Sequence, residues 1–156
     1  MKVRVFNPAD AAMLAEIFHD SVHRIGVKDY TKFQVDAWSP APVSADRFLA
    51  RVSDGRTVFV AVDGADKPLG FIELERSGHI DCFYCHSSIV RTGVGQALYR
   101  QLEEVALAMG MARLYTEASE AARRFFLRAG FTLMKRQEFE HNGVEIHNYL
   151  MEKSLR

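Results

Sequence analysis

The sequence has no excess of charge of either sign, because its 20 basic residues balance its 20 acidic ones. A chain without a global field has no long-range attraction for nucleic acid or for an anionic membrane surface. No apolar run approaches the length needed to span a bilayer, and residues 1–6 lack the apolar core of a signal peptide. We therefore expect a cytoplasmic protein whose partners include neither nucleic acid nor a membrane.

Cysteine is scarce, with Cys82 and Cys85 as its only examples. Together with His86 they spell Cys-x-x-Cys-His, the pattern that attaches c-type haem. The surrounding residues are typical of a strand, on which positions three apart face opposite ways. Reduced cysteines are commonly small, buried and apolar in role. We therefore favour packing over a haem, redox or zinc role, and we expect no metal.

Internal repeats, low-complexity tracts and an interdomain linker are all absent. With 156 residues, of which 48% are hydrophobic, we expect a single domain over residues 1–156. Periodicity, capping residues and turn signals predict strands and helices along the whole chain. The predicted strands are 3–6, 57–62, 69–75, 80–85, 112–117, 131–140 and 144–151, and the predicted helices are 8–24, 31–38, 44–54, 94–109 and 118–129.

The glycine turn in residues 90–96 is the most informative stretch. It follows the strand-like run 79–85 and precedes a helix whose apolar stripe comprises Val94, Leu98, Leu102, Val105 and Met109. The first amides of a helix lack intrahelical partners and the macrodipole is positive there, which favours an anion such as a pyrophosphate. A tight turn that needs glycine only for steric reasons is the alternative. The third glycine of the dinucleotide pattern and the Gly-Lys-Ser/Thr of the Walker loop are both missing.

Two blocks carry a resemblance to a known family. The first is Phe83-Tyr84-Cys85-His86 with the glycine turn, and the second joins Glu117-Ala118-Ser119 to the run 125–131. With the order of elements, they resemble the GNAT superfamily of acyl-CoA-dependent N-acetyltransferases over nearly the whole chain. The resemblance implies an α+β, three-layer fold, in which helices flank a central mixed, mostly antiparallel twisted sheet of about seven strands.

The resemblance also implies a donor site for acetyl-CoA. The pyrophosphate would lie on the turn, and the pantetheine chain would pair with the exposed strand edge nearby. Val90 stands where relatives usually have Gln or Arg, although Arg91 beside it can supply a cation. Ser119 would bind the cofactor or cap a helix. The implied donor residues are Phe83, Tyr84, Cys85, Val90, Arg91, Thr92, Gly93, Val94, Gly95, Gln96, Ser119 and Phe126.

For the chemistry, His79 and Asp81 lie two apart on a strand and therefore face the same side. Relatives often carry a base at the matching positions, but solvent-facing polar groups at a strand end are the alternative. Relatives also place a tyrosine, as acid toward the departing thiolate, where this chain has Phe126. Tyr84 and Tyr115 are substitutes or half-buried packing aromatics, and water can protonate the thiolate instead.

The resulting hypothesis is direct transfer of an acetyl group to an amine of a small molecule. Glu73, Glu75 and Glu117 can border the acceptor, or they are exposed strand residues. An aromatic cluster of Tyr30, Phe33 and Trp38 would wall the acceptor, or serve ordinary packing.

Three alternatives to direct transfer to a small molecule stay open. They are a non-catalytic acyl-CoA-binding sensor, a protein or peptide N-acetyltransferase, and transfer through a cysteine. The strand edge of the terminal hairpin also leaves a homodimer open.

Overall fold

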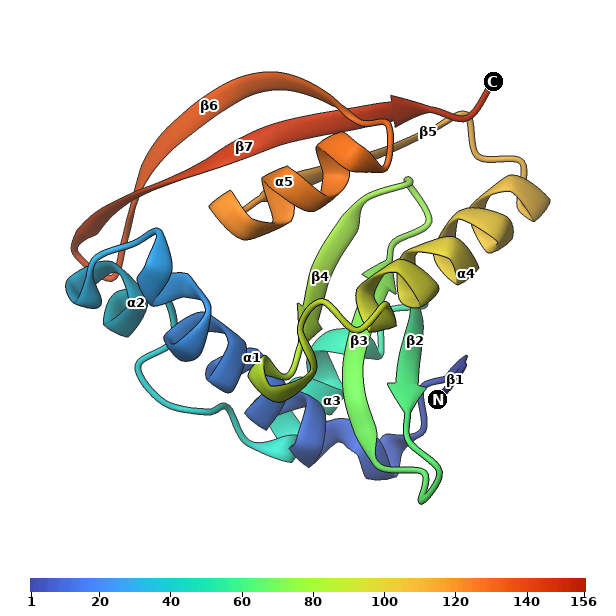
Figure 1. The fold of residues 1–156 in the computed structure, drawn as a ribbon, viewed down its shortest axis with the longest axis horizontal. Coiled ribbons are helices and arrows are strands. Elements are labelled where there is room, and N and C mark those ends of the chain that lie inside the picture. The colour runs from blue at the N-terminus through green and yellow to red at the C-terminus, as the bar shows by residue number, and fades with distance from the viewer.

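Seven strands and five α-helices follow one another in the computed structural model, which describes residues 1–156. Figure 1 shows their arrangement, with the terminal hairpin and the fifth helix at the top. None of the helices combines the length and the apolar character needed to cross a bilayer. The elements are β1 (Lys2–Val5), α1 (Ala11–Arg24), α2 (Lys32–Trp38), α3 (Ala45–Val52), β2 (Thr57–Val62), β3 (Pro68–Leu74), β4 (Ile80–Cys85), α4 (Val94–Ala108), β5 (Arg113–Ala118), α5 (Glu120–Arg128), β6 (Thr132–His141) and β7 (Val144–Ser154).

Local sequence sets most of these boundaries. The side chains of Asn7, Thr31, Ser44 and Ser119 each accept a hydrogen bond from a backbone N–H two or three residues on, at the start of a helical segment. Such caps satisfy amides that the helix leaves without a partner. The turn 142–143 joins β6 to β7 with two positive φ angles, +48° and +79°, as a two-residue hairpin requires. The predicted hairpin turn is confirmed, and so are the predicted caps at Asn7, Ser44 and Ser119. Residues 8–10 form a 3-10 turn before α1, and α5 begins at Glu120, two residues later than predicted.

The strands form two antiparallel sheets, in the orders β1-β2-β3-β4 and β5-β7-β6. The expected seven strands are therefore present, but they do not make one continuous ladder. The sheets meet at a single parallel bridge between His79 and Tyr115, where the Tyr115 N–H donates to the Gly78 carbonyl at 3.0 Å. Beyond it, the β4 edge that faces away from β3 has no strand partner.

Gly78 explains why the sheets touch at this one place. A Cβ at Gly78 would lie 2.3 Å from the Arg113 carbonyl oxygen, so only glycine allows the two backbones to come so close. On the other side of β4, the pairing with β3 shifts register between Ile72 and Leu74, and such bulges bend a strand. The tight junction and the bend leave β4 and β5 unpaired further along.

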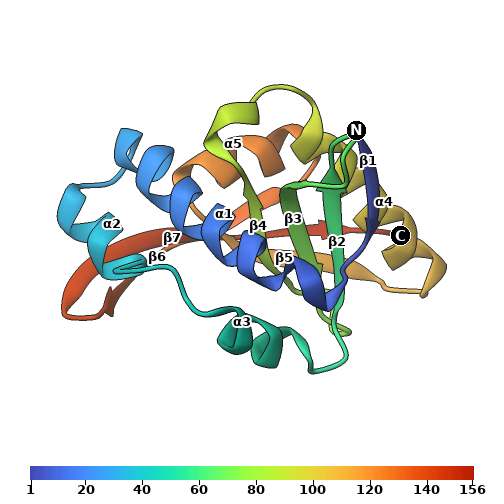
Figure 2. The same ribbon diagram turned by 90° about the horizontal axis from the view of Figure 1, so that it is seen from below.

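Apolar side chains pack on both faces of the β1–β4 sheet. One cluster lies beneath α4 and α5 and contains Leu98, Leu102 and Phe126, whereas the other lies beneath α1 and α3 and contains Leu14 and Phe48. Figure 2 shows α1 crossing in front of the strands while α4 lies behind them. Both faces of the sheet are covered, which confirms the predicted three-layer α+β fold.

The predicted apolar stripe of α4 is correct except at its end. Val94, Leu98 and Leu102 are buried and Val105 is partly buried, but Met109 is 53% exposed. The helix ends at Ala108, and Met109 is its C-cap residue. The expected place of Met109 in the stripe is therefore wrong, because the chain leaves the helical spiral there.

Candidate active site

The turn before α4 presents unpaired backbone donors. Gly93 is the N-cap residue in a left-handed conformation, with φ of +88°, and no side chain caps the helix. The N–H groups of Val94, Gly95 and Gln96 find no acceptor within the protein. Free amides at the positive end of a 15-residue helix favour an anion. This is the geometry that the glycine turn predicts for a phosphate site.

A cavity of about 810 Å³ opens directly onto this turn. Arg91 from the turn, Arg100 from α4 and Arg128 from the end of α5 bring three cationic side chains to its walls, so it suits a polyanionic ligand. Arg100 was not among the predicted donor residues, although it lies one helical turn beyond Gln96 and that spacing could have revealed it. The full lining is Arg91, Gly93, Gly95, Gln96, Tyr99, Arg100, Glu103, Glu104, Leu107, Phe125, Arg128 and Ala129.

Gly95 sits where α4 comes close to β4. A Cβ there would lie 3.3 Å from the Phe83 ring and 3.8 Å from the Cys85 sulfur. Phe83 and Cys85 face the cluster under α4 and α5, so the predicted strand edge and the predicted turn are neighbours. A ligand that crosses from the helix start to the β4 edge passes this glycine.

Tyr84 and Cys82 face the opposite side of β4. The Tyr84 ring packs at 4.7 Å from Phe18 of α1 and 6.1 Å from Phe71 of β3. Burial raises the pKa of Tyr84, with a smaller opposing effect from Trp38. Its hydroxyl is therefore a weak acid, and the contacts favour the packing role left open for it.

The cysteines cannot act together. Cys82 packs on the α1 side of the sheet and Cys85 on the α4 side, as the strand pattern predicts, so the Cys-x-x-Cys-His motif does not converge on one ligand. Burial raises the pKa of both thiols, that of Cys85 to about 12. Since the thiolate is the nucleophile, neither thiol is activated for acyl transfer.

Ser119 and Phe126 belong to the second block of the family resemblance, residues 117–119 and 125–131. Ser119 caps α5 by accepting a hydrogen bond from the Ala122 N–H at 3.3 Å. The expectation that Phe126 contacts the cofactor needs correction, because its ring is 1% exposed and packs at 4.7 Å from Phe131 in the core. Phe125, one residue earlier, lines the cavity instead. Which α5 residue faces the cavity depends on how the helix packs, and no local signal in the sequence gives it.

A network of charges lies on the α3 side of β3 and β4. Glu73 is fully buried and holds Arg51 at 2.6 Å and Arg56 at 2.7 Å. The Asp81 carboxylate accepts from the same two residues, at 2.6 Å from Arg56 and 3.2 Å from Arg51. Each carboxylate is thereby matched by cations, which a buried charge requires.

His79 joins the two sheets through its side chain as well. Its Nδ1 lies 2.7 Å from Glu75 and its Nε2 lies 2.9 Å from Glu117, and the ring stacks on Tyr115 at 4.9 Å. Carboxylates only accept, so both nitrogens donate and the ring is an imidazolium. The bond to Glu117 contributes most to raising the pKa of His79 to about 9, against the effect of burial. His79 and Asp81, which were predicted to face the same side, present side-chain atoms within 4.8 Å of each other, and Glu75 joins them.

The segment 30–38, which includes α2, contacts the terminal hairpin formed by β6 and β7. Trp38 packs on Phe139 and His141, and the Tyr30 hydroxyl donates to the His147 carbonyl while accepting from the Glu120 N–H. The predicted cluster of Tyr30, Phe33 and Trp38 does not form. Phe33 is 80% exposed, since it lies on the outer face of α2.

Glu120 forms a further link to the terminal hairpin, in this case from α5. Burial alone would raise the pKa of Glu120, but hydrogen bonds from Tyr149, His147 and Arg123 lower it to about 2. The carboxylate therefore stays ionised and binds α5 to β7 at neutral pH.

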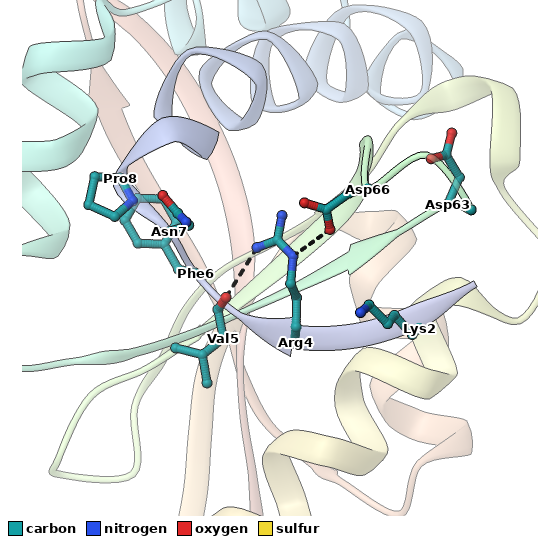
Figure 3. Close-up of a pocket in the computed structure, with 9 residues that line it drawn as sticks. Lys2, Arg4, Val5, Phe6, Asn7, Pro8, Asp63 and Asp66 are labelled. Atoms are coloured by element: carbon teal, nitrogen blue, oxygen red, sulfur yellow. Dashed lines mark hydrogen bonds and ion pairs between the residues drawn. The ribbon is translucent and has the colours of Figure 1, made fainter.

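A second cavity of about 510 Å³ lies beside β1 and the β2–β3 turn (Figure 3). Arg4, its most prominent cation, points at Asp66 and also pairs with Asp10 at 2.8 Å. The charge of Arg4 is already matched within the protein, which leaves Lys2 as the cationic side chain of this cavity without an ion pair.

Comparison with known proteins gives a consistent result. The sequence matches the family description "Acetyltransferase (GNAT) domain" over residues 26–153. The uncharacterized N-acetyltransferase YafP of Escherichia coli (strain K12) is 29% identical over 151 residues, which make up 97% of this chain and 94% of that protein. The chain therefore belongs to the GNAT family of acetyltransferases.

Solved structures agree with this assignment. A GCN5-related N-acetyltransferase from Rhodopseudomonas palustris, whose name also reads "Aminotransferase, Class-II", is 35% identical. Its TM-score is 0.90, and the match covers 98% of this chain and 94% of that one. A phosphinothricin acetyltransferase from Sinorhizobium meliloti, solved with acetyl-CoA, shares the fold at 20% identity. Its TM-score is 0.77, with 99% of this chain and 88% of that one covered.

Proposed function

We propose that the protein is an acetyl-CoA-dependent N-acetyltransferase that transfers the acetyl group directly to an amine of a small molecule. The observation that carries this is the row of free amides at Val94, Gly95 and Gln96, set in a cavity with three arginines. Such a site binds a pyrophosphate and its neighbouring phosphate through backbone donors and cations together. The acetyl-CoA in the Sinorhizobium meliloti structure supports the same donor for this chain.

The rest of the donor would follow the free edge of β4. Its backbone groups on that side have no strand partner, so an amide-bearing chain can add to the sheet there. The pantetheine would then run from the turn at Gly93 past Phe83 toward Ile80. This path places the thioester at the end of β4 where the two sheets meet.

Direct transfer is supported by the state of the two thiols. Both have a raised pKa and face opposite sides of β4, so neither offers an acyl-enzyme route. The reaction then depends on holding the amine against the thioester and on removing its proton.

A small acceptor is supported by the hairpin. The Asn142 amide donates to the Ala37 carbonyl at 2.7 Å, and the Gln34 amide donates to the Glu145 carbonyl at 3.0 Å. These bonds hold α2 across the end of the hairpin, so the chain itself covers that end.

The test is calorimetric titration of acetyl-CoA and CoA into the purified protein, followed by a panel of primary amines with thiol release as readout. We expect micromolar binding of both nucleotides and acetyl transfer to at least one small amine. Absence of binding would refute the donor site, and transfer only to peptide amines would refute the small acceptor.

One observation favours a second function. Phe126 has no hydroxyl and is buried, so the position that holds an acid in relatives is inert here. A non-catalytic acyl-CoA sensor would bind acetyl-CoA in the same cavity without turnover. Transfer to any amine in the panel would exclude the sensor.

A further inference from the structure

Glu117 occupies a distinctive place on β5. Leu114, Thr116 and Ala118 of this strand are buried, so by alternation Glu117 faces the other side of the sheet, away from α5. Tyr115 lies opposite His79 in the parallel bridge, and Glu117 follows Tyr115 by two residues on β5. The Glu117 carboxylate therefore lies where β4 and β5 have ceased to pair.

The other ionisable groups nearby already take part in ion pairs or charged hydrogen bonds. Both nitrogens of His79 donate to carboxylates, so the ring has no lone pair with which to accept a proton. Asp81 holds two guanidinium groups, and Glu73 is fully buried between the same two arginines. Glu75 lies on the far side of His79 from β5 and is also 3.9 Å from Arg56.

Glu117 differs from His79, Asp81 and Glu73 in having a free acceptor atom, and it differs from Glu75 in having no arginine within ion-pair distance. One of its oxygens accepts from His79 at 2.9 Å, its other oxygen has no partner within the protein, and the side chain is 38% exposed. The neighbouring residue on β7 adds no charge at that oxygen. Leu150 of β7 lies beside it in the ladder, and Arg113 of β5 is held by Glu152 at 2.7 Å.

We propose that Glu117 is the catalytic residue that takes the proton from the acceptor amine, and that His79 is a positioning residue that holds its carboxylate. This inference rests on the proposed function, because it uses the thioester position that follows from a donor laid along β4. It changes the assignment expected from the sequence, in which His79 or Asp81 was the base.

The acceptor arrives as an ammonium ion, loses one proton to solvent, and its nitrogen forms a bond to the thioester carbonyl carbon. The carbon–sulfur bond breaks, its electron pair leaves with the sulfur of CoA, and water protonates the thiolate. Glu117 takes the second proton from the nitrogen and passes it to solvent, so that one proton is released overall for each amide formed.

The test compares Glu117→Gln, Asp81→Asn, His79→Gln and the control Glu152→Gln, with an amine that the wild type acetylates. Glu152 suits as a control because it is an ion-paired glutamate on the neighbouring strand. We expect kcat/KM to fall about 100-fold or more in Glu117→Gln, less than tenfold in Asp81→Asn, and less than twofold in Glu152→Gln. The acetyl-CoA Kd should stay within twofold in all four, which also reports that each variant is folded.

His79→Gln distinguishes positioning from a merely structural role. We expect kcat to fall about tenfold and the acidic limb of the kcat/KM pH profile to move to higher pH, because an adjacent cation has been removed. An unmoved profile, a Glu117→Gln variant within threefold of wild type, or a 100-fold loss in Asp81→Asn would overturn the assignment. A wild type that binds acetyl-CoA but acetylates no amine would overturn the proposed function, and this assignment with it.

Discussion

At the scale of single residues, His79 shows how a side chain acquires its properties from distant partners. In the sequence it is a histidine next to a strand, and an unperturbed imidazole titrates near pH 6.5. In the fold, carboxylates from β5 and from the segment after β3 bind its two nitrogens. The side chain becomes a cation that links the sheets, which excludes it as a base near neutral pH.

This charge predicts a pH-dependent stability. The folded pKa of His79, about 9, exceeds the unfolded value of about 6.5, so its contribution is complete below pH 6.5 and is lost as the pH rises through 9. The contribution is on the order of 1–3 kcal/mol. Urea unfolding of wild type and His79→Gln should show a stability difference at pH 6 that shrinks by pH 9.5. An NMR titration of the His79 ring with a midpoint near 6.5 would contradict the linkage.

At the scale of elements, the contact between α4 and β4 depends on Gly95. The turn, the helix start and the strand edge form one continuous surface only because this position has no side chain. The glycine pattern predicts the turn, but the strand residues that face Gly95 follow from packing.

Gly95→Val should weaken acetyl-CoA binding at least tenfold. The added branches would meet the Phe83 ring and the Cys85 sulfur, with the nearest contact already at 3.3 Å for a Cβ, and would push α4 away from β4. Calorimetric titration gives the Kd. Gly64→Val is the matched control, since a Cβ there meets nothing within 4 Å, and equal affinities for the two variants would show that the surface does not depend on this contact.

At the scale of the whole molecule, two sheets joined at one bridge leave one strand edge free beside the donor cavity. A second free edge belongs to β6, the outer strand of the β5-β7-β6 sheet. Figure 1 shows β6 arching along the outside of the hairpin. Pairing of this edge with a second copy, which the sequence left open, stays untested.

The junction itself predicts the effect of Gly78→Ala. A methyl group 2.3 Å from the Arg113 carbonyl would force the sheets apart, in addition to the strain of a φ of +96°. We expect a loss of about 3 kcal/mol or more in the free energy of unfolding. Gly143→Ala should cost only about 1 kcal/mol, because its φ is also positive, +79°, but its Cβ would meet nothing within 4 Å. Urea unfolding measures both, and equal losses would mean that the close approach is unimportant.

Much of the fold could be read locally. Caps at Asn7, Thr31 and Ser44, the turn 142–143 and alternating strand residues placed the elements, because each signal acts within a few neighbouring residues. The glycine turn was equally local, since glycines and a following helix are enough to expose free amides.

The sequence by itself therefore determined the order of elements, the family and the glycine turn before α4. Only the tertiary structure decided that the sheet divides at Gly78, that Phe125 rather than Phe126 faces the cavity, and that Glu117 keeps an oxygen free. The physical reason is that helix rotation, backbone approach and charge pairing join residues far apart in the chain. Each of these outcomes depends on contacts with residues from distant parts of the chain. A local sequence pattern does not identify those residues.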